Sequence, residues 1–178
     1  VALDLANTSP AVCLPASAPD RGEGRILLVE DHPELAAYLA DRIGGHLPVT
    51  CVGSAEEAMT LLIKESNYRL VISDVVLPHA SGIELCHQIR QLPQALPVVL
   101  ISAKATMADR EAGLAAGAVA YLAKPFSFEA LLSEIAKAWP TVASRLDPMP
   151  VKEDNVDPLL AIALSRLSDS NLSVSDWA

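Results

Sequence analysis

Five polar residues stand at the ends of short apolar runs, and their side chains suit one kind of chemistry. Glu30 and Asp31 follow the first run, Asp74 follows the third, Ser102 closes the fourth and Lys124 follows the fifth. Three carboxylates in one place repel one another unless a cation lies between them. Mg²⁺ prefers such oxygen ligands, while an ammonium and a hydroxyl donate hydrogen bonds to a phosphoryl group. The set predicts a site for Mg²⁺ and a phosphoryl group, with one aspartate available as the nucleophile.

Each of these residues also has a purely structural explanation. Asp31 could cap a helix that begins at Pro33, and Asp74 could form a turn. Ser102 could bond locally at its strand end, and Lys124 could be a solvated surface lysine. All four together at the corresponding strand ends favour the chemical interpretation.

The apolar runs predict parallel strands that are covered on both faces, because their residues are apolar at successive positions. They lie at 26–29, 49–52, 70–73, 98–102 and 119–122. Helical patterns follow them and open at Pro33, Ser54, Gly82, Thr106 and Ser127. Ser54 and Glu57 form a predicted capping box. Five strand–helix pairs predict an open α/β sheet, whose ligands bind at the carboxyl ends of the strands.

Composition limits the possible functions. The 178 residues are 51% apolar and 20% charged, which permits a buried core and excludes wholesale disorder. The net charge of −9 disfavours contact with nucleic acid or anionic lipid. No apolar run reaches the roughly 18 residues of a membrane span. Three cysteines without paired or metal-type spacing are typical of a reduced, cytoplasmic chain with small buried thiols.

Proline-rich stretches divide the chain. Residues 1–24 and 142–157 are predicted linkers, and 25–141 form the α/β unit. Residues 158–178 carry a short helical pattern that cannot form a core of its own. The first linker and the start at Val1 indicate a piece of a longer protein.

Residues 25–141 resemble the receiver domain of two-component response regulators. The matching stretches are ILLVEDHP at 26–33, DVVLPHASG at 74–82, VVLISA at 98–103 and GAVAYLAKPF at 117–126. The intervals of 28 residues from Asp74 to Ser102 and 22 more to Lys124 also suit that family. The resemblance implies a doubly wound, five-stranded parallel sheet of the (βα)5 flavodoxin-like kind, here with a short C-terminal helical extension.

The resemblance assigns a role to each site residue. Asp74 is the phosphoacceptor. Mg²⁺ is held by Asp31 and Asp74, by the backbone carbonyl of Val76 and, through water, by Glu30. Lys124 pairs with the phosphoryl group and lies outside the packed core.

The resemblance also implies a switch. Ser102 moves to the phosphoryl group and Tyr121 follows inward, while small Ala103 leaves access to Asp74. The Lys124–Pro125 peptide bond is expected to be cis. The remodelled face comprises the fourth helix, fifth strand and fifth helix, and it is a candidate homodimer surface.

The implied function is to take a phosphoryl group from a histidine kinase. Such a domain catalyses only its own phosphorylation and is not an enzyme that turns over a metabolite. The alternative is a non-phosphorylated interaction scaffold, or pseudo-receiver. A haloacid-dehalogenase-type phosphohydrolase would need an aspartate where Val76 stands, and a flavin-binding domain would need a hydroxyl- or glycine-rich loop in place of residues 30–33.

The tail, residues 157–178, resembles the opening of an AraC-type helix-turn-helix domain, although Trp177 stands where leucine is more usual. A generic amphipathic helix that packs on the receiver is the alternative. The resemblance implies a transcriptional regulator that contacts DNA only through a domain missing from this fragment. The fragment itself is expected to be cytoplasmic without membrane contact. A histidine kinase preceding residue 1, as in membrane-anchored hybrid sensors, is a further expectation.

Overall fold

The computed structural model describes residues 24–104 and 106–146, and strands alternate with helices throughout them. The elements in chain order are β1 (Arg25–Val29), α1 (Pro33–Gly44), β2 (Val49–Val52), α2 (Ala55–Lys64), β3 (Tyr68–Asp74), α3 (Gly82–Arg90), β4 (Val98–Ser102), α4 (Met107–Ala115), β5 (Ala120–Ala123), α5 (Phe128–Ala138) and the 3₁₀ helix η1 (Pro140–Val142). The five predicted strand–helix pairs are confirmed.

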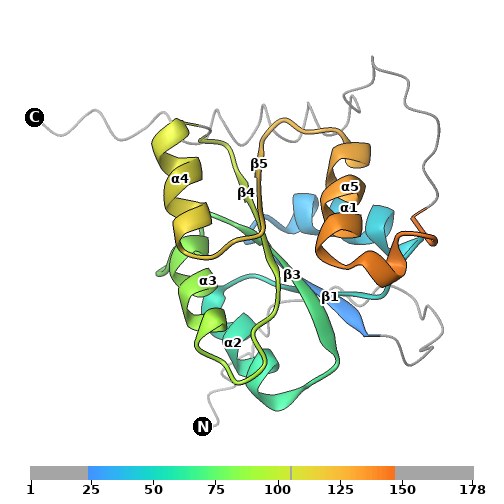
Figure 1. The fold of residues 1–178 in the computed structure, drawn as a ribbon, viewed down its shortest axis with the longest axis horizontal. Helices are drawn as coiled ribbons and strands as arrows, with labels where there is room; N and C mark the ends of the chain where they lie inside the picture. Colours follow the sequence, from blue (N-terminus) through green and yellow to red (C-terminus); the bar gives the residue numbers. More distant parts are fainter. Residues whose placement is uncertain (1–23, 105, 147–178) are drawn as a thin grey trace, which may run out of the picture.

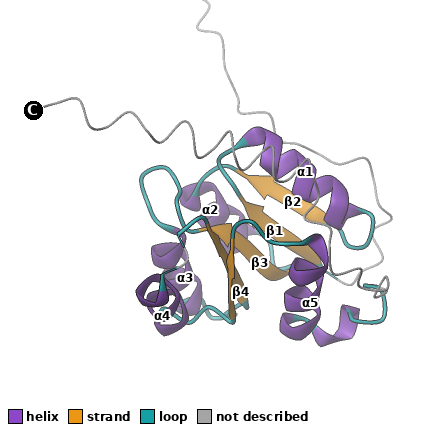
Figure 2. Cartoon of the chain, turned by 90° about the horizontal axis from the view of Figure 1, so that it is seen from above, coloured by secondary structure: helices purple, strands orange, loops and turns teal. Residues whose placement is uncertain are grey.

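The strands form one parallel sheet in the order β2-β1-β3-β4-β5. Helices α1 and α5 cover one face, and α2, α3 and α4 cover the other (Figures 1 and 2). The direction of winding reverses between β1 and β3, which lie side by side. Loops at the carboxyl ends of these two strands therefore diverge and leave the crevice in which open α/β sheets bind ligands.

The core consists of two apolar layers, one on each face of the sheet. Ile26 and Leu28 of β1 point into the layer under α1 and α5, whereas Leu27 and Val29 point into the layer under α2, α3 and α4. Successive side chains of a strand point to opposite faces, so a strand covered on both faces must be apolar at every position. This requirement explains the unbroken apolar run of β1.

Hydroxyl side chains begin four of the helices. Each accepts a hydrogen bond from the backbone N–H three residues further on, and the four are Ser54, Ser81, Thr106 and Ser127. The predicted box at Ser54 is only half formed, because the Glu57 carboxylate accepts from the Gly53 N–H at 3.0 Å instead of from Ser54. The reciprocal box instead lies at Ser81 and Glu84, which the sequence analysis did not identify.

The packed unit continues beyond the predicted boundary at residue 141. Helix α5 ends at Ala138, and the chain turns through η1 so that Val142 and Leu146 return to the layer under α1 and α5. These two side chains are 2% and 5% exposed, so both belong to the core although they lie in the stretch predicted as a linker. Residues 1–23, the rest of the second predicted linker and the predicted helical tail 158–178 lie outside the described residues.

Cys51 and Cys86 are buried thiols, as predicted, whereas Cys13 lies outside the described residues. Burial raises the pKa of the Cys86 thiol. Within residues 24–104 and 106–146, no helix has the length and apolar character needed to cross a membrane.

Candidate active site

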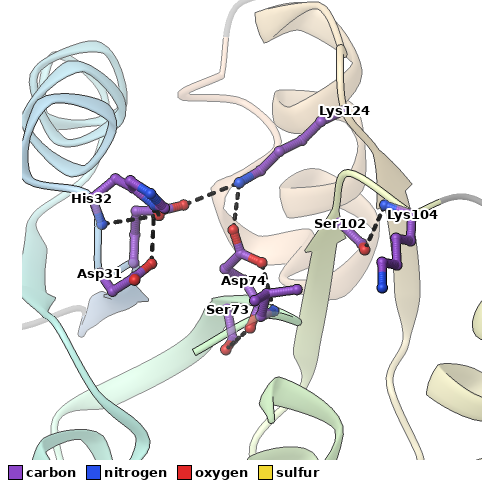
Figure 3. A network of polar contacts seen from close by, with 9 residues as sticks. Asp31, His32, Ser73, Asp74, Ser102, Lys104 and Lys124 are labelled. Atoms are coloured by element: carbon purple, nitrogen blue, oxygen red, sulfur yellow. Dashed lines mark hydrogen bonds and ion pairs between the residues drawn. The ribbon is translucent and has the colours of Figure 1, made fainter. Parts of the chain in front are cut away.

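The carboxyl ends of four neighbouring strands carry the predicted site residues. Glu30 and Asp31 follow β1, Asp74 closes β3, Ser102 closes β4 and Lys124 follows β5. The sheet register places these ends next to one another, since Val29 pairs with Ser73 and Ser102 pairs with Ala123. Figure 3 shows Lys124 reaching across to Asp74, with Asp31 on one side of that aspartate and Ser102 on the other.

Lys124 links two of the carboxylates. Its Nζ donates to Glu30 Oε2 at 3.3 Å and to Asp74 Oδ2. Only 6% of the Lys124 side chain is exposed, and the two carboxylates are 2% and 7% exposed. The lysine side chain is therefore buried in the polar site, although it belongs to neither apolar layer of the core. The two carboxylates lie at the ends of buried strands, where water does not solvate them. They therefore require a positive charge from the protein.

Burial and neighbouring charge act together on the ionisation of this group. Burial raises the pKa of Glu30, and the charge of Asp74 raises it further, while Lys124 opposes both. Burial alone would lower the pKa of Lys124, but the charges and hydrogen bonds of Glu30 and Asp74 outweigh it and raise that pKa. The lysine therefore remains an ammonium at neutral pH. When ionised, Glu30, Asp31 and Asp74 carry a formal charge of −3 against +1 on Lys124, and the net −2 matches a divalent cation.

The third carboxylate has an unsatisfied oxygen. Asp31 Oδ1 is buried and has no hydrogen-bond partner. A buried acceptor left without a partner costs on the order of 1–3 kcal/mol, and more when it is charged. A divalent cation would relieve this cost, so the residues present fit a metal ion. The capping alternative does not hold for Asp31, because the N-cap of α1 is His32 and no side-chain cap bond is present there.

His32 also contacts two of these carboxylates, which was not predicted from the sequence. Its backbone N–H donates to Glu30 Oε1 at 3.2 Å, and its ring Nδ1 lies 3.1 Å from the same oxygen. The ring Nδ1 also lies 3.0 Å from Asp31 Oδ1. Its position directly after two acidic residues was the available signal.

The backbone around Asp74 holds its carboxylate in place. Asp74 Oδ1 accepts a hydrogen bond from the Val76 N–H at 2.8 Å. Asp74 therefore both forms a local turn and contributes to the site. Gly82 packs against the backbone of Asp74, where a Cβ would lie 2.1 Å from the Asp74 carbonyl oxygen. Only glycine permits this approach. The assignment of the Val76 carbonyl as a metal ligand stays a prediction.

The two predicted switch residues contact the same residue, Lys104. The Lys104 N–H donates to Ser102 Oγ at 3.0 Å, which is the local bond considered as the alternative for this serine. The Tyr121 hydroxyl donates to the Lys104 carbonyl at 2.7 Å, and the tyrosine ring is buried. Gly113 of α4 lies against that ring. Neither Lys104 nor Gly113 was identified from the sequence, because both contacts cross between elements. The expected cis Lys124–Pro125 bond is confirmed.

The fold and this strand-end arrangement are those of a receiver domain. A model of the response regulator receiver domain family matches residues 26–136, which is more than half of the chain, and the chain therefore belongs to that family. Receiver domains generally bind Mg²⁺ at the phosphorylation site and take phosphoryl groups from histidine kinases, and they are not classical enzymes.

Curated relatives are response regulators and transcriptional regulatory proteins. The chain is 38% identical over 109 residues to the two-component response regulator PhoP of Pseudomonas aeruginosa, covering 60% of this chain and 48% of PhoP. It is 35% identical over 139 residues to the transcriptional regulatory protein TcrA of Mycobacterium tuberculosis, covering 76% of this chain and 52% of TcrA. The chain thus spans about half the length of these relatives.

Solved structures support the same fold. The BeF3-activated N-terminal receiver domain of Klebsiella pneumoniae RstA matches with a TM-score of 0.60 and 28% identity, over 65% of this chain and 97% of that one. The non-phosphorylated HemR receiver domain of Leptospira biflexa matches with a TM-score of 0.58 and 29% identity, over 65% and 93%. Vibrio cholerae CheY4, with a TM-score of 0.60 at 24% identity over 65% and 98%, shares the fold. The flavodoxin-like receiver fold is confirmed.

Proposed function

We propose that this domain accepts a phosphoryl group from a histidine kinase onto Asp74 and uses it as a conformational signal. The observation that carries the proposal is the buried ammonium of Lys124 between Glu30 and Asp74, beside an unsatisfied oxygen of Asp31. In the reaction, a carboxylate oxygen of Asp74 attacks the phosphorus of a phosphohistidine. A P–O bond forms, the P–N bond breaks, and the imidazole leaves with the bonding electron pair and takes a proton from solvent.

The site residues divide the remaining work. Mg²⁺ would be held by Asp31, Asp74 and the Val76 carbonyl, with Glu30 acting through water, and it supplies positive charge to the phosphoryl oxygens. Lys124 pairs with an oxygen of the transferred group as a point charge. The Val76 N–H keeps the Asp74 carboxylate oriented for attack.

The switch follows from the contacts of Ser102 and Tyr121. Because the Ser102 hydroxyl only accepts from Lys104, it keeps its own proton for an oxygen of the phosphoryl group. Movement of Ser102 would shift Lys104, and the hydrogen bond from Tyr121 transmits that shift to β5. Large apolar side chains are exposed along α4 and just before β5, and they are Met107, Leu114 and Val119. We infer that the α4–β5–α5 face forms a homodimer after phosphorylation.

The test is intact-mass measurement after incubation with a small acyl or amido phosphate. With Mg²⁺ we expect one phosphoryl adduct, and with EDTA in place of Mg²⁺ we expect none. Asp74→Asn removes the nucleophile and should abolish the adduct, whereas Asp41→Asn, an exposed aspartate near the C-terminal end of α1, should leave it unchanged. An unmodified wild-type mass contradicts the proposal and favours a non-phosphorylated scaffold, and an adduct that survives Asp74→Asn contradicts Asp74 as the phosphoacceptor.

For the whole protein we propose transcriptional control through an AraC-type helix-turn-helix domain that begins near residue 158, with DNA contact by that domain alone. A histidine kinase segment before residue 1, and hence a hybrid sensor of which this part is cytoplasmic, is a further proposal. The resemblance of residues 157–178 supports the AraC-type domain, and the net charge of −9 supports DNA contact by that domain alone. A mobility-shift assay should show specific DNA binding by a chain extended by about eighty residues and none by residues 1–178.

A further inference from the structure

The imidazole of His32 has no role in the proposed phosphotransfer, yet it faces the cation site. Its Nδ1 lies 3.1 Å from Glu30 Oε1 and 3.0 Å from Asp31 Oδ1. Glu30, Asp31 and His32 each offer one ligand atom, and all three atoms lie within 4.8 Å of one another. The group therefore combines two oxygen ligands with one nitrogen ligand.

The separations match the edges of an octahedral coordination sphere. Metal–ligand bonds of about 2.1 Å at right angles place adjacent ligand atoms about 3.0 Å apart. The distances of 3.0 and 3.1 Å from Nδ1 to the two carboxylate oxygens agree with this value. Asp31 Oδ1 is a buried oxygen that accepts no hydrogen bond, and His32 Nδ1 lies 3.0 Å from it, so a cation between them would have both atoms as ligands. Geometry and the unsatisfied oxygen thus indicate the same position for an ion.

The backbone fixes the ring where an ion can reach it. His32 is the N-cap of α1 and is followed by Pro33, and its N–H is held by Glu30 Oε1 at 3.2 Å. The His32 side chain is 45% exposed, whereas that of Glu30 is 2% exposed. The imidazole therefore lies at the mouth of the site, between solvent and the buried carboxylates.

Ligand type decides which ions such a group prefers. Mg²⁺ is bound through oxygen, whereas an imidazole nitrogen suits divalent first-row transition ions. We propose that His32 Nδ1 is a ligand in this cation site, so that the site binds a divalent transition ion through nitrogen as well as oxygen. This inference rests on the proposed function only in placing a metal ion beside Asp31, and it makes Glu30 a direct ligand of the transition ion, whereas Glu30 would hold Mg²⁺ through water.

Calorimetric titrations with Co²⁺ and with Mg²⁺ provide the first test. His32→Asn keeps an amide that can donate to Glu30 but removes the imidazole. We expect it to weaken Co²⁺ binding at least about tenfold while Mg²⁺ binding changes less than about threefold. His87→Asn, an exposed histidine on α3, is the matched control and should change neither affinity.

Paramagnetic NMR of the Co²⁺-loaded protein separates ligation from positioning. Wild-type protein should show strongly shifted imidazole ring signals that are absent in His32→Asn and present in His87→Asn. Unchanged Co²⁺ affinity in His32→Asn, or an equal loss for both ions, overturns the inference, because the ring then only orients Glu30. Shifted His32 signals in a wild type that does not bind Mg²⁺ would uphold the ligand role and contradict the proposed function instead.

Discussion

At the scale of single residues, the electrostatics of the site depend on one buried cation among three carboxylates. Lys124 contacts Glu30 and Asp74 directly, and the third carboxylate, Asp31, has a buried oxygen that accepts no hydrogen bond. Removing one member of a buried ion pair costs more than the pair contributes, because the remaining charge is left without compensation. Substitutions in this group should therefore change stability in opposite directions according to the sign of the charge removed.

Lys124→Ala should lower the free energy of unfolding by about 3 kcal/mol at neutral pH without Mg²⁺, since it leaves Glu30 and Asp74 facing each other uncompensated. Urea unfolding measures the effect. Lys137→Ala is the matched control, because Lys137 forms an exposed pair with Glu134 that contributes at most about 0.5 kcal/mol. Adding Asp74→Asn to Lys124→Ala should recover much of the loss. If the double variant is no more stable than Lys124→Ala, charge is not the cause.

Asp31→Asn should have the opposite effect without Mg²⁺ and raise the free energy of unfolding by about 1 kcal/mol, because it removes one of three neighbouring carboxylate charges and the buried Oδ1 accepts no hydrogen bond in the folded protein. Wild-type protein should gain stability as Mg²⁺ is added, whereas the variant should respond much less. Thermal unfolding over a series of Mg²⁺ concentrations checks both statements. An equal response of the two proteins to Mg²⁺ would exclude Asp31 as a ligand.

At the scale of elements, the contact of α4 with β5 depends on a missing side chain. A Cβ on Gly113 would lie 2.9 Å from Tyr121 Cδ2 and 3.0 Å from Leu100 Cδ1. Glycine lowers the intrinsic stability of a helix interior by about 1 kcal/mol relative to alanine. Helix α4 thus accepts a poorer helix former at the position where the Tyr121 ring packs beneath it. The hydrogen bond from Tyr121 to Lys104 depends on this packing.

Gly113→Ala should lower the free energy of unfolding by about 1 kcal/mol, because overpacking of about 1–3 kcal/mol exceeds the gain in helix propensity. It should also shift the NMR signals of the Tyr121 ring. Gly44→Ala, at the end of α1 where nothing lies within 4 Å of the added Cβ, should be neutral or stabilising. In a Tyr121→Ala background the loss from Gly113→Ala should disappear. Its persistence there would assign the strain to Leu100 alone.

At the scale of the whole molecule, three buried groups respond to alkaline pH in the same direction. Burial raises the pKa of Cys86 and of Tyr68. The carboxylates raise the pKa of Lys124 in spite of its burial. For each group the folded protein holds its proton to higher pH than the unfolded chain. Between the two pKa values the unfolded chain therefore binds fewer protons, and stability falls as pH rises.

The contribution of these three groups to the free energy of unfolding should therefore be constant below about pH 8.5. It should decrease as pH rises above about 9, where the thiols and then the phenols of the unfolded chain ionise. Urea unfolding at a series of pH values measures the slope. Tyr68→Phe removes one of the three groups and should make the decrease shallower. A slope that is the same in wild type and Tyr68→Phe would show that this phenol does not contribute.

Some features of this protein were determined by its sequence alone, because they are local. Strand β1 had to be apolar at every position to lie between two layers of helices, so it could be identified from its own residues. Once strands alternate with helices, parallel pairing brings their carboxyl ends together. The positions of Asp74, Ser102 and Lys124 at three of those ends therefore predicted one site.

Other features were decided only by the tertiary structure, because they depend on which side chains meet across elements. Lys124 lies 94 residues from Glu30 in sequence, and its burial between two carboxylates follows from the sheet order. The contact of Gly113 with Tyr121 depends on how α4 packs on β5. Val142 and Leu146 lie in a proline-bordered stretch that predicts a linker, yet η1 returns both to the core. Local pattern carries no information on such packing, since each contact depends on the position of a second, distant element.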